Sequence, residues 1–189
     1  MDGGEPGDVK KGGNKNIMIK SRTELAKYFN ELGFTYGAEI GVSYGHYSEV
    51  LCLNILSLKL LCVDSWPPPR RDGVKRRAVR RLSRFNAVII HKTSMDAVKD
   101  IPDESLDFVY IDADHRYRFI AEDIREWTKK VGKGGIVSGH DYLISHLCEV
   151  KRAVDEYVKE HDIDLKVIDW DMDNPNRKER FPGWYFFKK

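Results

Sequence analysis

Acidic and imidazole side chains follow two apolar segments of this chain. Asp112 follows the apolar run LDFVYI, with His115 shortly after it, and His140 and Asp141 follow the run GGIVSG. Carboxylates and imidazoles are the groups that accept protons near neutral pH and that bind divalent metal ions. If the two segments are neighbouring strands of one sheet, these side chains meet in one cleft as metal ligands or proton acceptors.

A turn with two glycines follows an earlier apolar segment, in the stretch GAEIGVSYGHYSEV at residues 37–50. A strand that stops at a glycine and continues as a helix leaves amide N–H groups unpaired, and these groups bind ligands. The turn has no Lys after Gly45, which a phosphate-binding P-loop requires, and it lacks the third glycine of the dinucleotide motif GxGxxG. The remaining pattern, ExGxxxG, is formed by Glu39, Gly41 and Gly45.

Asp64 follows the next apolar run, LKLLCV, within the segment LKLLCVDSW. It follows the turn by roughly twenty residues, the offset at which an acidic side chain accepts hydrogen bonds from ribose hydroxyls. Two glycines, no phosphate-binding Lys and a ribose acceptor together indicate a nucleoside that carries an amino-acid-like group. S-adenosylmethionine has this chemistry.

Alternating strands and helices position these residues. Apolar runs typical of buried parallel strands occur at 36–42, 58–66, 86–93, 106–114 and 134–142, and two further strand-like runs occur at 165–170 and 183–189. Helical patterns separate the first five runs, and Ser21 with Glu24 predicts a capping box for a helix that precedes them. We therefore predict an α/β fold with a Rossmann-like, doubly wound seven-stranded sheet. It is mostly parallel with an antiparallel final strand, and helices cover both faces.

Composition indicates one intracellular domain. The chain has 189 residues, 41% of them hydrophobic, and a net charge of +2. We expect a disordered tail over residues 1–16 and a single domain over residues 17–189. The sequence shows no apolar run that could span a bilayer and no signal-peptide pattern. Cys52, Cys62 and Cys148 lack metal-finger spacing and are expected to be reduced, so we predict a cytoplasmic protein.

Four segments carry a resemblance to a known family. EIGVSYG, LLCVDSW, DFVYIDADH and GKGGIVSGHDY occur in the order found in class I S-adenosylmethionine-dependent methyltransferases. The resemblance runs from about Ser21 to the carboxyl terminus, and the last two segments are most similar to a branch of small O-methyltransferases. Members of this branch act on sugars and other small molecules and often carry a divalent metal ion.

The resemblance implies a binding role for particular residues. It places the methionine part of the cofactor at Glu39, Gly41 and Ser43, the ribose at Asp64 and the adenine near Thr93, Ser94 and Met95. Gly45 and Asp112 are also expected to bind the cofactor. Many members have an Asp at the first positions of the adenine loop, where this chain has Thr93 and Ser94.

Methyl transfer from a sulfonium is an in-line displacement that needs an aligned acceptor oxygen and removal of its proton. The resemblance implies catalytic roles for Asp112, His115, His140 and Asp141. In metal-dependent O-methyltransferases of this branch, the positions of Asp112, His140 and Asp141 hold magnesium. Imidazole suits manganese better than magnesium, so either ion is a candidate. The alternative is a metal-free general base, His115 or His140, and both roles stay open. Asp114 is interpreted as the N-cap of the following helix.

A basic run is the strongest charge feature. It consists of Arg70, Arg71, Lys75, Arg76, Arg77, Arg80, Arg81 and Arg84, with Asp72 as its only acid. Such a run is usually a solvated helix face, but it also fits an anionic acceptor, nucleic acid included.

Three functions therefore compete. The leading prediction is O-methylation of a small molecule or sugar by a monomer or homodimer that does not contact membranes. The first alternative is methylation of nucleic acid or another anionic acceptor through the basic run, although the chain lacks the NPPY-type motif of amino-group methylases. The second is a non-catalytic module that binds S-adenosylmethionine for a partner protein.

Overall fold

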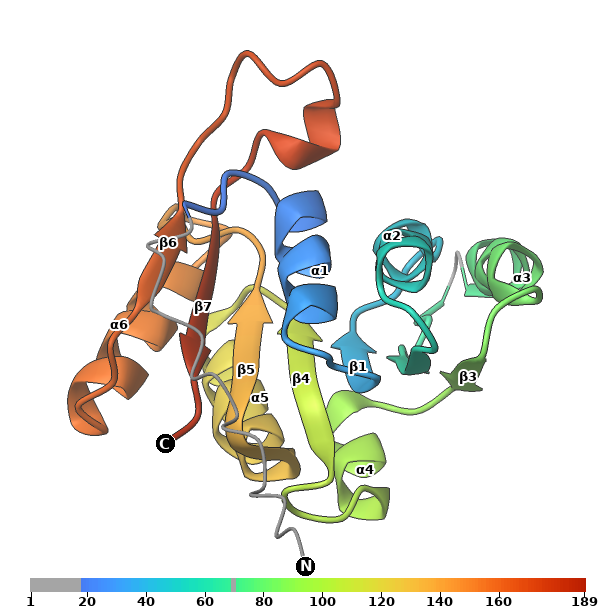
Figure 1. Cartoon of the computed structure of the whole chain (residues 1–189), viewed down its shortest axis with the longest axis horizontal. Helices are drawn as coiled ribbons and strands as arrows, with labels where there is room; N and C mark the ends of the chain where they lie inside the picture. Colours follow the sequence, from blue (N-terminus) through green and yellow to red (C-terminus); the bar gives the residue numbers. More distant parts are fainter. Residues whose placement is uncertain (1–17, 69–70) are drawn as a thin grey trace, which may run out of the picture.

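The computed structural model describes residues 18–68 and 71–189 and forms one seven-stranded sheet (Figure 1). The strands are β1 Tyr36–Ile40, β2 Lys59–Val63, β3 Ala87–Ile90, β4 Leu106–Ile111, β5 Val131–Gly139, β6 Lys166–Ile168 and β7 Gly183–Phe187. Their order in the sheet is β3-β2-β1-β4-β5-β7-β6. Strands β1 to β5 are parallel, whereas β7 is antiparallel to both of its neighbours. The predicted fold class is confirmed.

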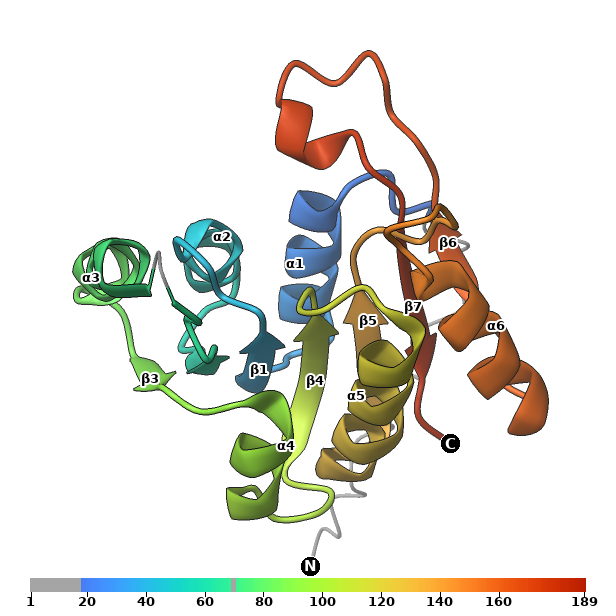
Figure 2. The same cartoon turned by 180° about the vertical axis from the view of Figure 1, so that it is seen from behind.

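Helices cover both faces of the sheet. They are α1 Arg22–Glu31, α2 His46–Asn54, α3 Arg71–Leu82, α4 Ser94–Ala97, α5 Tyr117–Lys130 and α6 Val150–Glu160, with short 3₁₀ turns at η1 Val98–Asp100 and η2 Arg177–Glu179. Helices α1 to α3 pack on one face, and Figure 2 shows α4 and α5 on the other, together with α6. Two apolar cores result, one on each side of the sheet. No helix among the described residues is both long and apolar enough to span a membrane.

Helix α1 begins where the sequence predicts it, with one difference in its capping. The Ser21 hydroxyl accepts a hydrogen bond from the amide of Glu24 at 3.2 Å, as expected of an N-cap. The Glu24 carboxylate, however, accepts from the amide of Lys20 at 2.7 Å, one residue earlier than a capping box requires. The helix buries Leu25 and Phe29 completely, and each such side chain stabilises the fold by about 1.5–3 kcal/mol.

The strand order reverses between β1 and β4. From β1 the chain builds outward to β2 and β3, and from β4 it builds in the opposite direction to β5. Ligands of such sheets bind beyond the carboxyl ends of the strands at this reversal. The glycine turn follows β1 and Asp112 follows β4, so both lie at this point. The predicted tail, residues 1–16, lies outside the described residues, and the domain boundary stays a prediction.

Candidate active site

Gly41 lets the ends of the two central strands approach each other closely. Its φ is +96°, and a Cβ atom built on it would lie 2.0 Å from the carbonyl oxygen of Asp112. On either side of this contact the Asp112 amide donates to the carbonyl of Ile40 at 2.8 Å, and the Gly41 amide donates to that of Val63 at 2.9 Å. Only glycine fits here, because both the positive φ and the contact exclude a side chain.

Asp64 connects the loops that follow β1 and β2. Its Oδ2 accepts a hydrogen bond from the amide of Ser43 at 2.7 Å, and its Oδ1 accepts from the amide of Trp66 at 2.6 Å. The indole Nε1 of Trp66 donates to the carbonyl of Ser43 at 2.9 Å. Ser43 and Trp66 have φ values of +48° and +37°, so these bonds hold two non-glycine residues in the left-handed region. The carboxylate is thereby fixed in place.

A cavity of about 650 Å³ opens beside these loops, within the size range of small-molecule sites. Six residues that the sequence assigned to the cofactor line it: Gly41, Ser43, Asp64, Ser94, Met95 and Asp112. They come from the ends of β1, β2 and β4 and from the start of α4. The structure thus brings most of the predicted cofactor residues together around one space.

Glu39 and Gly45 do not line this cavity. The Glu39 side chain is completely buried beneath the turn, where its carboxylate accepts a hydrogen bond from the Ser48 hydroxyl of α2. Burial raises the pKa of Glu39 to about 8. Gly45 is the N-cap of α2 with a φ of +73°, and its Cα faces α3, where a Cβ atom would lie 3.3 Å from the Cα of Ala78. In this structure Glu39 and Gly45 therefore stabilise the turn and do not line the cavity.

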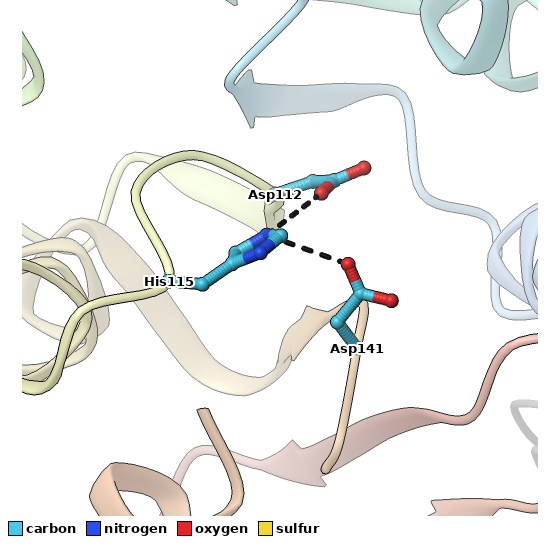
Figure 3. Close-up of side chains that lie close together, drawn as sticks. All are labelled: Asp112, His115 and Asp141. Atoms are coloured by element: carbon cyan, nitrogen blue, oxygen red, sulfur yellow. Dashed lines mark ion pairs between the residues drawn. The ribbon is translucent and has the colours of Figure 1, made fainter. Parts of the chain in front are cut away.

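Two carboxylates and one imidazole converge on one another (Figure 3), and one of the carboxylates, Asp112, lines the cavity. The Nε2 atom of His115 lies 3.5 Å from Oδ1 of Asp112 and 3.4 Å from Oδ2 of Asp141. One ligand atom from each residue lies within 4.8 Å of the others, a spacing that one divalent cation can bridge. Asp112 raises the pKa of His115 above its usual range, and although burial opposes this effect, Asp141 adds to it. We call this set the Asp112–His115–Asp141 cluster.

His140 lies outside the cluster, contrary to the metal-ligand set expected from the sequence. Its Nδ1 is 3.2 Å from Oδ1 of Asp141, and its ring centroid is 6.1 Å from that of Phe181. Asp141 has a φ of +50°, a strained conformation for a non-glycine residue. Burial acts to raise the pKa of Asp141, but the hydrogen bond from His140 and the charge of His115 outweigh it, so that the pKa is lowered.

The loop that carries His115 is held by the start of α6. The amide of Glu149 donates to the carbonyl of His115 at 2.8 Å, and the Glu149 carboxylate accepts from the amide of Tyr117 at 3.1 Å. The expectation that Asp114 caps α5 is wrong, because Arg116 occupies the N-cap position. Asp114 instead accepts from the amide of Arg116 at 3.0 Å and pairs with its guanidinium group at 2.6 Å.

The sequence analysis did not identify Asp123 as a residue of the cavity. Asp123 of α5 lines the cavity and is 3% exposed. It lies on the apolar face of its helix, between the buried residues Ile120, Ile124 and Trp127. The sequence did contain a signal for Asp123, because helical periodicity assigns this acidic residue to the buried face of its helix.

The basic run divides into paired and exposed residues on α3. Arg81 and Arg84 both pair with Glu49 of α2, at 2.8 and 3.1 Å, and the guanidinium of Arg77 lies 5.7 Å from the ring centroid of Tyr44. Arg76 and Arg80 are exposed. Arg70 lies outside the described residues.

Comparison with known proteins identifies the family. A family model described as a methyltransferase domain matches residues 38–142, more than half of the chain. The chain belongs to this methyltransferase family. The matched segment of the methyltransferase domain includes the glycine turn, Asp64 and the Asp112–His115–Asp141 cluster. The family predicted from the sequence is confirmed.

Solved structures share the fold of this methyltransferase domain. An O-methyltransferase from Bacillus cereus in complex with S-adenosylhomocysteine superposes with a TM-score of 0.70 at 13% identity, covering 88% of this chain and 80% of that one. An O-methyltransferase of tomaymycin synthesis from Streptomyces achromogenes, in complex with S-adenosylmethionine, gives 0.68 at 15% identity and covers 89% and 80%. At such identities the likeness shows the fold.

A curated relative matches part of the sequence. The uncharacterized protein y4gI of Sinorhizobium fredii is 25% identical over an alignment of 113 residues, and the match covers 56% of this chain. The match spans 12% of that relative's length.

Proposed function

We propose that this protein transfers the methyl group of S-adenosylmethionine to a hydroxyl oxygen of a small molecule or sugar. One observation carries the proposal: Asp112 lines the cofactor-sized cavity and also belongs to the Asp112–His115–Asp141 cluster. A methyl donor in the cavity would therefore end beside groups that can remove a proton from an acceptor. Direct displacement needs this proximity of donor and acceptor.

The chain's own residues would bind the cofactor in sequence along the cavity. The turn at Gly41 and Ser43 would take the methionine part, and Asp64 would accept the ribose hydroxyls. The carboxylate of Asp64 is already oriented by two backbone amides, so little ordering is needed on binding. Ser94 and Met95 would lie beside the adenine.

The cluster fits a divalent cation such as Mg²⁺ or Mn²⁺. Two carboxylates and one imidazole form a donor set of the kind that manganese accepts. The imidazole in this set is that of His115, whereas the sequence analysis expected His140. When bound, the ion would lower the pKa of the acceptor hydroxyl and orient it. Asp112 and Asp141 supply the negative charge that favours such an ion, and His115 must be neutral to bind it.

The alternative role for His115 is a metal-free general base. Its Nε2 atom is buried and makes no hydrogen bond that satisfies normal geometry within the described residues. A general base needs only one proton-accepting group. The convergence of two carboxylates on the His115 imidazole therefore favours a metal-ligand role over a general-base role.

The loop between β6 and β7 would border the acceptor. Its ring pair, Trp170 and Phe181, has centroids 5.4 Å apart, and Phe181 also faces His140. The two rings are about half exposed, at 49% and 45%. The buried carboxylate of Glu179 anchors this loop to α1, because it accepts from the Arg22 side chain at 3.3 Å and the Thr23 amide at 3.1 Å.

A second candidate acceptor is anionic, nucleic acid included. Residues 70–84 hold eight basic side chains and one acid, while the whole chain is +2, so the remaining residues together carry −5. Within α3, Arg76 and Arg80 are like charges one turn apart, which destabilises a helix slightly. This segregation of charge favours an anionic partner over a purely solvated face.

A methyl-transfer screen tests the proposed function. The purified protein is incubated with S-adenosylmethionine labelled in its methyl group and with panels of sugars, phenols, aliphatic alcohols and RNA. Mass spectrometry then detects labelled product. Label on a small-molecule oxygen supports the leading proposal, label on RNA alone supports the anionic alternative, and no label on any acceptor supports a non-catalytic binding module.

We propose a cytoplasmic protein that acts as a monomer or homodimer. The three cysteines, Cys52, Cys62 and Cys148, are free thiols in the structure, as a reducing compartment favours.

A further inference from the structure

A buried carboxylate forms part of the cavity wall away from the cluster. Asp123 is 3% exposed, yet it lines the cavity together with its neighbour Glu122. No lysine, arginine or histidine side chain that the structure describes forms an ion pair with it. Burying a carboxylate without a cation is costly unless hydrogen bonds compensate, and here burial raises the pKa of Asp123 to about 6.

A chain of hydrogen bonds orients this carboxylate. The indole Nε1 of Trp127 donates to the hydroxyl oxygen of Ser94 at 2.8 Å, and that hydroxyl is bonded to Oδ1 of Asp123. An indole N–H only donates and a serine hydroxyl has one hydrogen, so the direction is fixed: Trp127 to Ser94 to Asp123. Oδ1 is thus satisfied by the protein, whereas no described residue donates to Oδ2. The second oxygen is left for a donor in the cavity.

The position of Asp123 within the cavity identifies the donor. This argument rests on the proposed function, because it takes the ligand to be S-adenosylmethionine. With the reacting end at Asp112 and the ribose at Asp64, the adenine falls beside Ser94 and Met95, which also line the cavity, and Asp123 is hydrogen-bonded to Ser94. The edge of adenine offers one strong donor, the exocyclic N6 amino group.

We infer that Asp123 is the residue that recognises the adenine of the cofactor, by accepting a hydrogen bond from its N6 amino group. A hypoxanthine base has a carbonyl oxygen at this position. Two acceptors would then face each other, with the buried oxygen of Asp123 left unpaired. Sites that hydrogen-bond one group reject an analogue lacking it for this reason. Asp123 is therefore a specificity-determining residue for the adenine base.

The alternative is that Asp123 only ties α4 to α5 through Ser94. The substitution Asp123→Asn separates the two roles, because the amide oxygen can still accept from Ser94 while the amide nitrogen presents a donor to the cavity. A purely structural role predicts the same base preference in this variant. Recognition predicts that the preference for adenine is lost, since the new donor suits the hypoxanthine oxygen.

The experiment is calorimetric binding of S-adenosylhomocysteine and of S-inosylhomocysteine, its hypoxanthine analogue. The wild type should prefer S-adenosylhomocysteine by roughly 10- to 100-fold, the scale of a hydrogen bond to a charged group. Asp123→Asn should lose most of that preference. The matched control is Glu122→Gln, which neutralises the adjacent carboxylate of the same cavity wall and should keep the wild-type preference.

The outcomes distinguish this inference from the proposed function. If the wild type binds S-adenosylhomocysteine with no preference over the inosine analogue, or if Asp123→Asn keeps the wild-type preference, the adenine assignment is overturned while the cofactor stands. If the wild type does not bind S-adenosylhomocysteine, the proposed cofactor is overturned and the adenine assignment falls with it. If the Asn variant does not fold, the wild-type comparison still tests the inference, because a wild type without an adenine preference overturns it.

Discussion

His115 and Asp141 lie with Nε2 and Oδ2 3.4 Å apart, although they follow different strands. The contact exists because β4 and β5 are parallel neighbours whose carboxyl ends coincide, with Ile111 opposite Gly139. It is also made possible by the left-handed backbone of Asp141 and by the bonds from Glu149 to the loop of His115. The residues of the Asp112–His115–Asp141 cluster are therefore placed by the sheet and oriented by the loops.

Removal of the Asp64 carboxylate should weaken cofactor binding. Asp64→Ala is expected to cost roughly 1.5–3 kcal/mol of S-adenosylhomocysteine affinity, the scale for hydrogen bonds to a charged group. Calorimetry measures the change. Part of the loss will come from the loops, since Asp64 also holds Ser43 and Trp66. Unchanged affinity would contradict the assignment of Asp64 as the acceptor of the ribose hydroxyls.

A side chain at Gly41 should disrupt the site. In Gly41→Ala the new methyl group would meet the Asp112 carbonyl, and the positive φ adds strain, so unfolding should become easier by at least about 1–3 kcal/mol. The control is Gly73→Ala in α3, where a Cβ meets no atom within 4 Å and helix propensity should raise stability by up to about 1 kcal/mol. Denaturant unfolding compares the two. Equal effects would contradict the close-approach argument.

Metal binding should depend on His115 and not on His140. Titration of Mn²⁺ followed by electron paramagnetic resonance should show binding to the wild type and to His140→Ala, but loss of binding in His115→Ala and Asp141→Asn. Affinity should fall as the pH is lowered through the raised pKa of His115, because the proton competes with the ion. Binding that is lost in His140→Ala and kept in His115→Ala would restore the ligand set expected from the sequence.

The exposed arginines of α3 offer a separate test. If the acceptor is anionic, Arg76→Glu combined with Arg80→Glu should raise its KM and make the remaining binding less sensitive to salt. The control pair is Arg118→Glu with Arg125→Glu on α5, outside the basic run. If the α3 variant has the same kinetics and salt response as the wild type, these arginines form only a solvated helix face and do not bind the acceptor.

The sequence was sufficient for the fold because its signals are local and repeated. Apolar runs separated by amphipathic helices defined the strands, and polar residues at strand ends such as Asp64 and Asp112 marked the binding edge. Glycine positions were informative for the same reason, since the conformation required at Gly41 is a property of the turn itself.

The choice among side chains at the site could not be read in the same way. Whether His115 or His140 joins the carboxylates depends on the path of a loop that Glu149, from another helix, holds in place. Asp123 meets Ser94 only after α5 packs beside α4. Such contacts join residues far apart in the sequence, so no local sequence pattern predicts them.

The most direct test of the central claim is transfer of a labelled methyl group by the wild type and by His115→Ala, with binding of S-adenosylhomocysteine measured in parallel. The account predicts that both proteins bind S-adenosylhomocysteine with similar affinity and that only the wild type labels an acceptor oxygen at a substantial rate. The variant should lose at least about 100-fold in rate, because removing the acceptor's proton typically contributes that much. A wild type that binds the ligand but labels no acceptor, or a variant as fast as the wild type, would contradict the account.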